Sequence, residues 1–115
     1  MGGRMVDLTK NEEILLLSIW RLKEKAYGVQ IKNFIKENTG KDWNYGTLYC
    51  TLDQLVRKAI LFKREGKPMP ERGGRRKIFY TISPDGIKAL QAALELQKVL
   101  WDGITSLALG EGMQS

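Results

Sequence analysis

The order of secondary structure in this chain is decided by residues 45–82, which read YGTLYCTLDQLVRKAILFKREGKPMPERGGRRKIFYTI. The first part of this stretch repeats apolar side chains at helical spacing and predicts a helix over about residues 45–59. The apolar positions are Leu48, Leu52, Leu55, Val56 and Ala59. A short strand over 61–65 and an alternating strand over 75–82 follow, with a Gly- and Pro-rich loop over 66–74 between them. The stretch therefore predicts a helix followed by a β-hairpin.

Most of the net positive charge lies in the same stretch. Residues 57–77 contain nine Lys or Arg and two Glu, a net charge of +7, whereas the whole chain has a net charge of +6. The basic character therefore belongs to one segment and not to the whole chain. A solvated loop is one interpretation of such a run. The other is a surface that attracts phosphates, and the helix and hairpin predicted around it favour this second interpretation.

Two further helices are predicted before this stretch. Thr9 and Glu12 form a capping-box pattern at the start of the first one. Its apolar residues between 14 and 22 cover most of its circumference, so this helix is expected at the centre of the fold. A second helix is expected over about residues 28–39. Trp43 follows it and is expected to pack beneath the hairpin or at the turn.

The composition excludes several classes of function. A chain of 115 residues, 43% of them apolar and 28% charged, is ordinary for one globular domain. The absence of His removes His-based metal sites and Ser-His or Cys-His nucleophile pairs. The single Cys, Cys50, cannot form an internal disulfide and is expected to be half-buried. No apolar run reaches the roughly 20 residues of a transmembrane helix. We therefore expect a cytoplasmic protein that is not an enzyme and holds no metal or cofactor.

The predicted order is that of a winged helix-turn-helix, a mainly α fold with a small β-hairpin, extended by a long C-terminal dimerisation helix. The expected organisation is a flexible N-terminus over 1–7, a DNA-binding domain over 8–82, a dimerisation helix over 83–109 and a disordered tail over 110–115. Such a fold suits double-stranded DNA, because the major groove admits one α-helix whose polar side chains reach base edges. The expected DNA contacts are Tyr45, Thr47, Tyr49, Thr51, Gln54, Lys58, Lys67, Arg72, Arg75, Arg76 and Lys77.

Four short motifs carry a resemblance to a known family. They are ILLL at 14–17, Tyr27-Gly28, GTLY at 46–49 with Leu52 and Leu55, and GGRRK at 73–77 running into Tyr80, Ile82 and Gly86. On these residues the chain resembles the PadR-like family of transcriptional regulators, in the short form with one C-terminal helix. The resemblance implies a dimeric repressor. Its third helix would read the major groove, its hairpin (the wing) would grip the DNA backbone, and its last helix would supply most of the dimer contact.

The last helix is expected to start at Ser83-Pro84, to run to about Leu107 and to need a partner. It carries more apolar residues than one small domain can cover, so a homodimer is expected. The dimer residues are expected to be Ile87, Leu90, Leu94, Trp101 and Ile104, with a second apolar set at Ala93, Leu96, Leu100 and Leu107. Some multidrug-responsive members of the family bind flat aromatic compounds between paired Trp side chains. Alignment places that Trp at Gln97, one turn before Trp101, so the resemblance makes Gln97 and Trp101 candidates for binding a small planar hydrophobic effector.

Three alternatives stay open. A penicillinase-repressor-like winged helix has similar first and third helices, although the GGRRK motif argues against it. A winged-helix module that binds a protein partner would use the same wing or last helix. An enzyme is the weakest alternative, because the sequence shows no paired catalytic carboxylates, phosphate-binding Gly loop or nucleophile-base pair.

Overall fold

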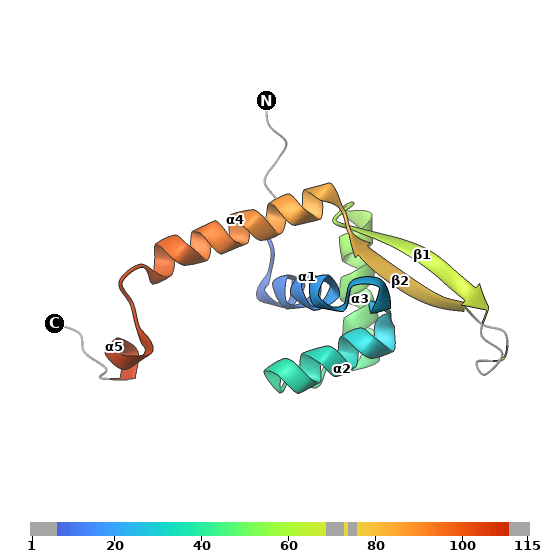
Figure 1. Cartoon of the computed structure of the whole chain (residues 1–115), viewed down its shortest axis with the longest axis horizontal. Helices are drawn as coiled ribbons and strands as arrows, with labels where there is room; N and C mark the ends of the chain where they lie inside the picture. Colours follow the sequence, from blue (N-terminus) through green and yellow to red (C-terminus); the bar gives the residue numbers. More distant parts are fainter. Residues whose placement is uncertain (1–6, 69–72, 74–75, 111–115) are drawn as a thin grey trace, which may run out of the picture.

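The computed structural model describes residues 7–68, 73 and 76–110. Three helices form the body of the molecule, with a hairpin on one side of it and a long helix reaching away on the other (Figure 1). The elements are α1 (Lys10–Leu22), a 3-10 turn η1 (Lys23–Lys25), α2 (Gly28–Thr39), α3 (Tyr45–Arg57), β1 (Leu61–Pro68), β2 (Arg76–Ile82), α4 (Pro84–Trp101) and α5 (Ser106–Gly110). The predicted winged-helix order is confirmed.

The first helix lies at the centre, as expected. Its start is fixed by a capping box, in which Thr9 Oγ1 accepts from the Glu12 amide at 3.1 Å and Glu12 Oε1 accepts from the Thr9 amide at 2.9 Å. Leu15 and Leu16 are fully buried, and α1 packs against α2, α3, α4 and β2. One side of α1 stays open, since Leu17 is 46% and Trp20 is 51% exposed, but its other sides are covered by these four elements.

The core confirms one packing prediction and contradicts another. Trp43 is 8% exposed and belongs to the hydrophobic core, as its position in the turn indicated. Cys50 was expected to be half-buried and is exposed, because it lies on the side of α3 that points away from the core residues of that helix. The other core residues are Leu15, Leu16, Ile19, Ala26, Ile31, Ile35, Leu48, Leu52, Leu55, Ile60, Leu61 and Tyr80.

The wing consists of β1 and β2, paired antiparallel from Leu61 opposite Ile82 to Glu65 opposite Ile78. The first strand runs to Pro68 and not to residue 65, so the expectation of a loop from Gly66 was wrong. The Phe79 ring crosses Gly66, where an added Cβ would lie 2.6 Å from Phe79 Cε2. A residue without a side chain is needed for that contact, so the glycine continues the strand where its sequence signal suggested a break.

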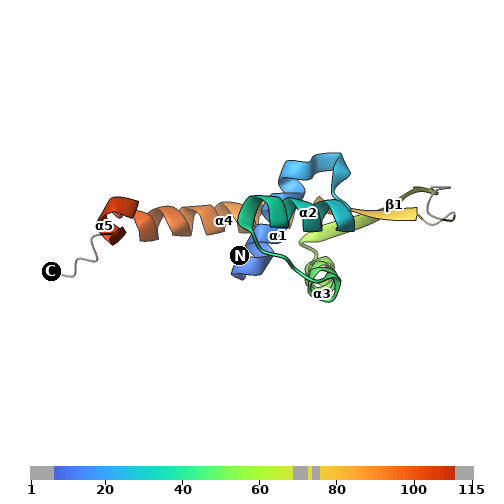
Figure 2. The same ribbon diagram turned by 90° about the horizontal axis from the view of Figure 1, so that it is seen from below.

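The last helix is shorter than expected. Ser83 caps it by accepting from the Gly86 amide at 3.0 Å, but α4 ends at Trp101, well before Leu107. Gly103 has a φ of +77°, a left-handed conformation that stops the helix, and the short α5 follows after this break. The distal part of α4 projects away from the body in both views (Figures 1 and 2). No described helix is long and apolar enough to cross a membrane.

Candidate nucleic-acid interface

The orientation of α3 decides which of its side chains can reach DNA. Asn44 caps the helix by accepting from the Thr47 amide at 2.7 Å, and the apolar side of the helix is buried in the core. At about 100° per residue, the side directly opposite carries Gly46, Cys50, Asp53 and Arg57. All four are exposed. We call these four residues the outward face of α3.

Four of the expected DNA contacts, Thr47, Thr51, Gln54 and Lys58, form a polar stripe on one flank of this face. Thr47 and Gln54 are exposed, whereas Thr51 is half-buried and its Oγ1 donates to the Thr47 carbonyl at 2.8 Å. Thr51 and Gln54 line a hollow of about 470 Å³ whose other wall is formed by residues 9–12, the cap and first turn of α1. The sequence pattern identified the polar stripe but not the outward face. The outward face could have been located from the sequence, because it lies half a helical turn from the apolar residues of α3.

Lys58, the last member of the expected stripe, is paired with α1. Its Nζ lies 2.9 Å from Glu12 Oε2, and only 5% of the Glu12 side chain is exposed. Burial raises the pKa of Glu12, but hydrogen bonds from Thr9 and Lys58 and the charge of Lys58 outweigh it, so the pKa is lowered overall. The carboxylate is therefore charged at neutral pH and holds the end of α3 against the start of α1.

The start of α3 presents a pair of aromatic rings. Tyr45 and Tyr49 stack with ring centroids 6.1 Å apart and are both exposed by more than two-fifths. Lys32 of α2 lies 5.3 Å from the Tyr45 ring and 3.0 Å from Asp42, and its hydrogen bond and charge lower the pKa of that carboxyl. Lys32 is not among the contacts predicted from the sequence, because only the packing of α2 against α3 brings it beside the predicted tyrosines.

The described part of the wing carries several of the expected cations. Lys67 is exposed, Arg76 Nη1 lies 3.7 Å from Glu65 Oε1, and Lys77 Nζ lies 4.2 Å from the Tyr27 ring. Arg72 and Arg75 lie outside the described residues. The cations thus occur on both strands, where Lys67 and Arg76 are exposed and Lys77 is half-buried. By contrast, α4 carries equal numbers of acidic and basic residues.

Tyr80 joins the wing to α3. It is 4% exposed, and its burial, with additions from the neighbouring Tyr49 and Asp53, raises the pKa of its phenol to about 12. Its amide also donates to the Ala26 carbonyl at 2.9 Å. The wing is therefore fixed to the body beside the outward face of α3.

The expected dimer residues divide between the core and the surface. Leu90 packs against the hydrophobic core and Ile87 is half-buried, whereas Leu94 and Trp101 are about half exposed. Ile104 lies beyond the end of α4, where its amide donates to the Trp101 carbonyl at 2.9 Å. The exposed large apolar residues at this end of the chain are Leu94, Leu96, Val99, Leu100, Trp101, Ile104, Leu107 and Leu109.

A family model for PadR-like transcriptional regulators matches residues 16–92, which include the second half of α1, all of α2 and α3, the wing and the start of α4. The chain belongs to the PadR-like family. It is thus a transcriptional regulator with the winged-helix DNA-binding fold. No curated protein matches the sequence.

Solved structures agree with this PadR-like assignment. A PadR family transcription regulator from hypervirulent Clostridium difficile R20291 is 26% identical with a TM-score of 0.60, over 89% of this chain and 98% of that chain. RosR of H. salinarum is 25% identical with a TM-score of 0.60, over 86% and 82%. F93 from STIV, a winged-helix DNA-binding protein, is 20% identical with a TM-score of 0.62, over 85% and 98%, and supports the fold alone.

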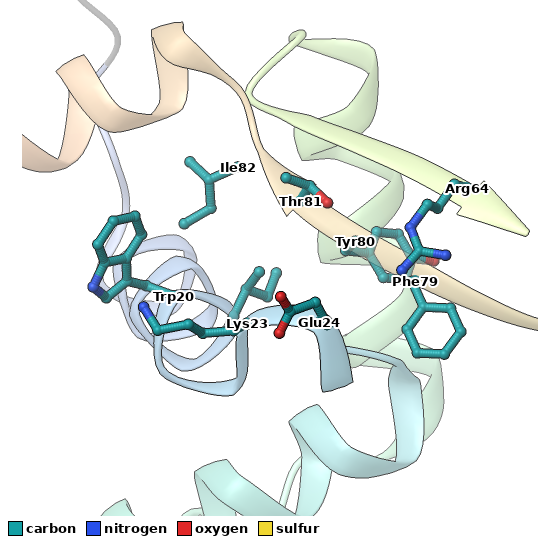
Figure 3. Close-up of a pocket in the computed structure, with 9 residues that line it drawn as sticks. Trp20, Lys23, Glu24, Arg64, Phe79, Tyr80, Thr81 and Ile82 are labelled. Carbon is teal, nitrogen blue, oxygen red and sulfur yellow. The ribbon is translucent and has the colours of Figure 1, made fainter. Parts of the chain in front are cut away.

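This PadR-like regulator also has a hollow of about 310 Å³ on the side of the wing that faces the end of α1 (Figure 3). Trp20, Lys23 and Glu24 form one wall, and Arg64, Phe79 and Thr81 of the wing form the other. Lys23 lies 4.6 Å from the Trp20 ring and Arg64 lies 4.7 Å from the Phe79 ring. No residue of α3 lines the hollow, so it is separate from the outward face.

Proposed function

We propose that this chain is a homodimeric repressor that binds operator DNA with α3 in the major groove and the wing on the sugar-phosphate backbone. The observation that carries the proposal is the joint placement of the exposed outward face of α3 and the basic wing, whose Tyr80 lies in the same hydrophobic core as the buried side of α3. Groove-facing side chains read base edges and wing cations bind phosphates, and a regulator needs both. The proposal includes a cytoplasmic location, since a repressor must reach the chromosome.

The proposed DNA contacts fall into three groups according to the part of the fold that carries them. Thr47, Cys50, Asp53, Gln54 and Arg57 face the groove, whereas Tyr45, Tyr49 and Lys32 lie where the start of α3 meets the backbone. The wing contributes Lys67, Arg76 and Lys77, together with Arg72 and Arg75. Proteins of this family act by binding DNA, and we propose no catalytic reaction for this chain.

The homodimer would form through α4. Its distal half exposes Leu94, Leu96, Val99, Leu100 and Trp101 by half or more, an unusual run of apolar surface for an isolated monomer. Two-fold pairing of this surface buries the same residues on both copies and sets the two α3 helices a fixed distance apart. Ile87 and Leu90 would border the interface, where each α4 returns to its own body.

Gln97 and Trp101 would bind a small planar hydrophobic effector within this dimer. Trp101 is 53% exposed and Gln97 is half-buried one turn before it. Titration of the purified chain with flat aromatic dyes should quench Trp fluorescence. Quenching that persists in Trp101→Phe would place the dye elsewhere, with Trp20 in the hollow of Figure 3 as the alternative fluorophore.

Selection of bound duplexes from a random DNA pool tests the function as a whole. A dimer of this kind should enrich a palindrome with half-sites about one helical turn, or 34 Å, apart. Enrichment of no sequence, together with binding that does not depend on salt, would contradict the proposal. That pair of results would favour a winged-helix module that binds a protein partner.

A further inference from the structure

Lys58 lies at the end of α3 that is nearest the start of α1, and it is held there by a buried acid. Its Nζ donates to Glu12 Oε2 at 2.9 Å, and the Lys58 side chain is 47% exposed whereas that of Glu12 is 5% exposed. The other oxygen, Oε1, accepts from the Thr9 amide at 2.9 Å. Both oxygens of the carboxylate are therefore used, one by the helix cap and one by Lys58.

The pair stands beside the surface that would meet DNA. Glu12 lines the same hollow as Thr51 and Gln54 of α3, and Lys58 follows Gln54 by one helical turn. A lysine at this position, if it were free, could swing its ammonium group to a nearby phosphate. Every such contact adds affinity for all sequences equally, because a phosphate carries no sequence information.

Glu12 makes that swing unfavourable. If Lys58 left, the charge of a nearly buried carboxylate would lose its partner, and removing one member of a buried ion pair is more costly than the loss of an exposed one. The gain in return would be a single exposed phosphate contact. The wing, by comparison, carries cations that no buried acid holds.

We propose that Glu12 withholds Lys58 from DNA and thereby limits the sequence-independent affinity of this regulator for DNA. The inference rests on the proposed DNA binding. Glu12 acts through Lys58 and contacts no DNA itself: it keeps a sequence-independent contact from forming next to the side chains of α3 that read bases. Lys58, although it lies in the polar stripe, then contributes nothing to DNA affinity in the wild-type protein.

The variant Glu12→Gln tests this without removing the helix cap. The glutamine carbonyl still accepts from the Thr9 amide, since Gln serves in a capping box as Glu does. Its amide group, however, carries no charge to hold Lys58. We expect binding to random duplex DNA to strengthen about fivefold near 0.15 M salt, with a salt slope steeper by about 0.9, the amounts expected for one added phosphate contact. Binding to the selected operator should rise by no more than the same factor, so that discrimination does not improve.

Two matched variants complete the measurement. Lys58→Met keeps the aliphatic stem and should bind random duplex DNA within about twofold of the wild type, with the same salt slope, because no phosphate contact is lost. The double variant Glu12→Gln/Lys58→Met should behave like Lys58→Met. Thermal unfolding of each variant establishes that it is folded.

Several outcomes would overturn the inference. A Lys58→Met variant whose salt slope becomes shallower by about 0.9 would show that Lys58 already binds a phosphate in the wild-type complex. A folded Glu12→Gln variant with unchanged binding would show that Glu12 does not restrain Lys58. Failure of the wild-type chain to bind any duplex would instead contradict the proposed function, and this result is distinct from both of the others.

Discussion

The phenol ring of Tyr49 lies directly over the α-carbon of Gly28. A Cβ added at Gly28 would lie 2.7 Å from Tyr49 Cζ and closer still to the hydroxyl oxygen. Gly28 is the first residue of α2 and is buried. Tyr49 is in the second turn of α3 and stacks on Tyr45. The close approach therefore sets how α3 lies against α2, and with it the direction of the outward face.

Gly28→Ala should disturb this contact. Alanine forms helices better than glycine, so intrinsic helix propensity favours the substitution. The added methyl group, however, would have to displace the Tyr49 ring. We expect a net loss of about 1–3 kcal/mol in the free energy of unfolding, which is typical of overpacking, and weaker operator binding. Urea unfolding measures the first effect. In a Tyr49→Leu background the same substitution should cost much less, and equal costs in the two backgrounds would show that the ring is not the obstacle.

The wing should govern the salt dependence of DNA binding. Replacing both Lys67 and Arg76 with Ala should weaken binding to every sequence and make the salt slope shallower by up to about 1.8, since each phosphate contact contributes about 0.9. Fluorescence anisotropy on operator and random duplexes over a range of salt concentrations measures this. Lys98→Ala, which removes a cation of α4 that pairs with Glu95 at 3.5 Å, serves as the control and should leave the slope unchanged. A double variant with the wild-type slope would place the wing away from the backbone.

Asp53 should read a base. It is an exposed acid on the outward face of α3, where a carboxylate repels phosphates but accepts a hydrogen bond from the amino group of cytosine. We expect Asp53→Asn to relax one position of the selected operator, with a loss of discrimination of about 1–3 kcal/mol there, while binding to random DNA strengthens. Asp102→Asn, beyond the end of α4, is the matched control. Retention of the complete operator preference by Asp53→Asn would remove this assignment.

The exposed face of α4 should hold the dimer together. Leu94→Glu and Leu100→Glu each place a charge in the proposed interface, and burial of one leucine is worth about 1.5–3 kcal/mol before the cost of the charge is added. We expect the dimer dissociation constant to rise at least about 100-fold, as measured by sedimentation equilibrium. Val29→Glu alters an apolar residue of α2 that is 43% exposed and should leave the dimer intact. Variants of α4 that sediment as the wild-type dimer would place the interface elsewhere.

Stability should fall in acid partly through Glu12. The pKa of this carboxyl is lowered in the folded state, since the hydrogen bonds and charge around it outweigh its burial. A group of this kind stabilises the fold above its unfolded pKa, and this stabilisation is lost as the pH falls from about 5 through the folded pKa. Urea unfolding at pH 7 and pH 4 should show a smaller acid loss for Glu12→Gln than for the wild type. The same loss in both proteins would assign the acid sensitivity to other carboxyls.

The main helices, the two strands and their order could be predicted from the amino-acid sequence. Local signals are enough for this: a capping box fixes the start of α1, Ser83 and Pro84 fix the start of α4, and the apolar spacing of Leu48, Leu52 and Leu55 fixes the buried side of α3. The concentration of positive charge in residues 57–77 is likewise a property of the sequence. Each of these features depends on residues close together along the chain, and for that reason they were predictable.

The partners of those side chains depend on how the helices and strands pack against one another. Gly66 continues a strand because the Phe79 ring crosses it, and the ammonium group of Lys58 turns toward α1 because Glu12, 46 residues away, accepts its hydrogen bond. Lys32 became part of the site because α2 brings it beside Tyr45. Two of the four motifs that carry the family resemblance, Tyr27-Gly28 and GTLY, meet in one contact between Gly28 and Tyr49. Contacts between residues distant in sequence leave no periodic pattern, so only the packing of the helices reveals them.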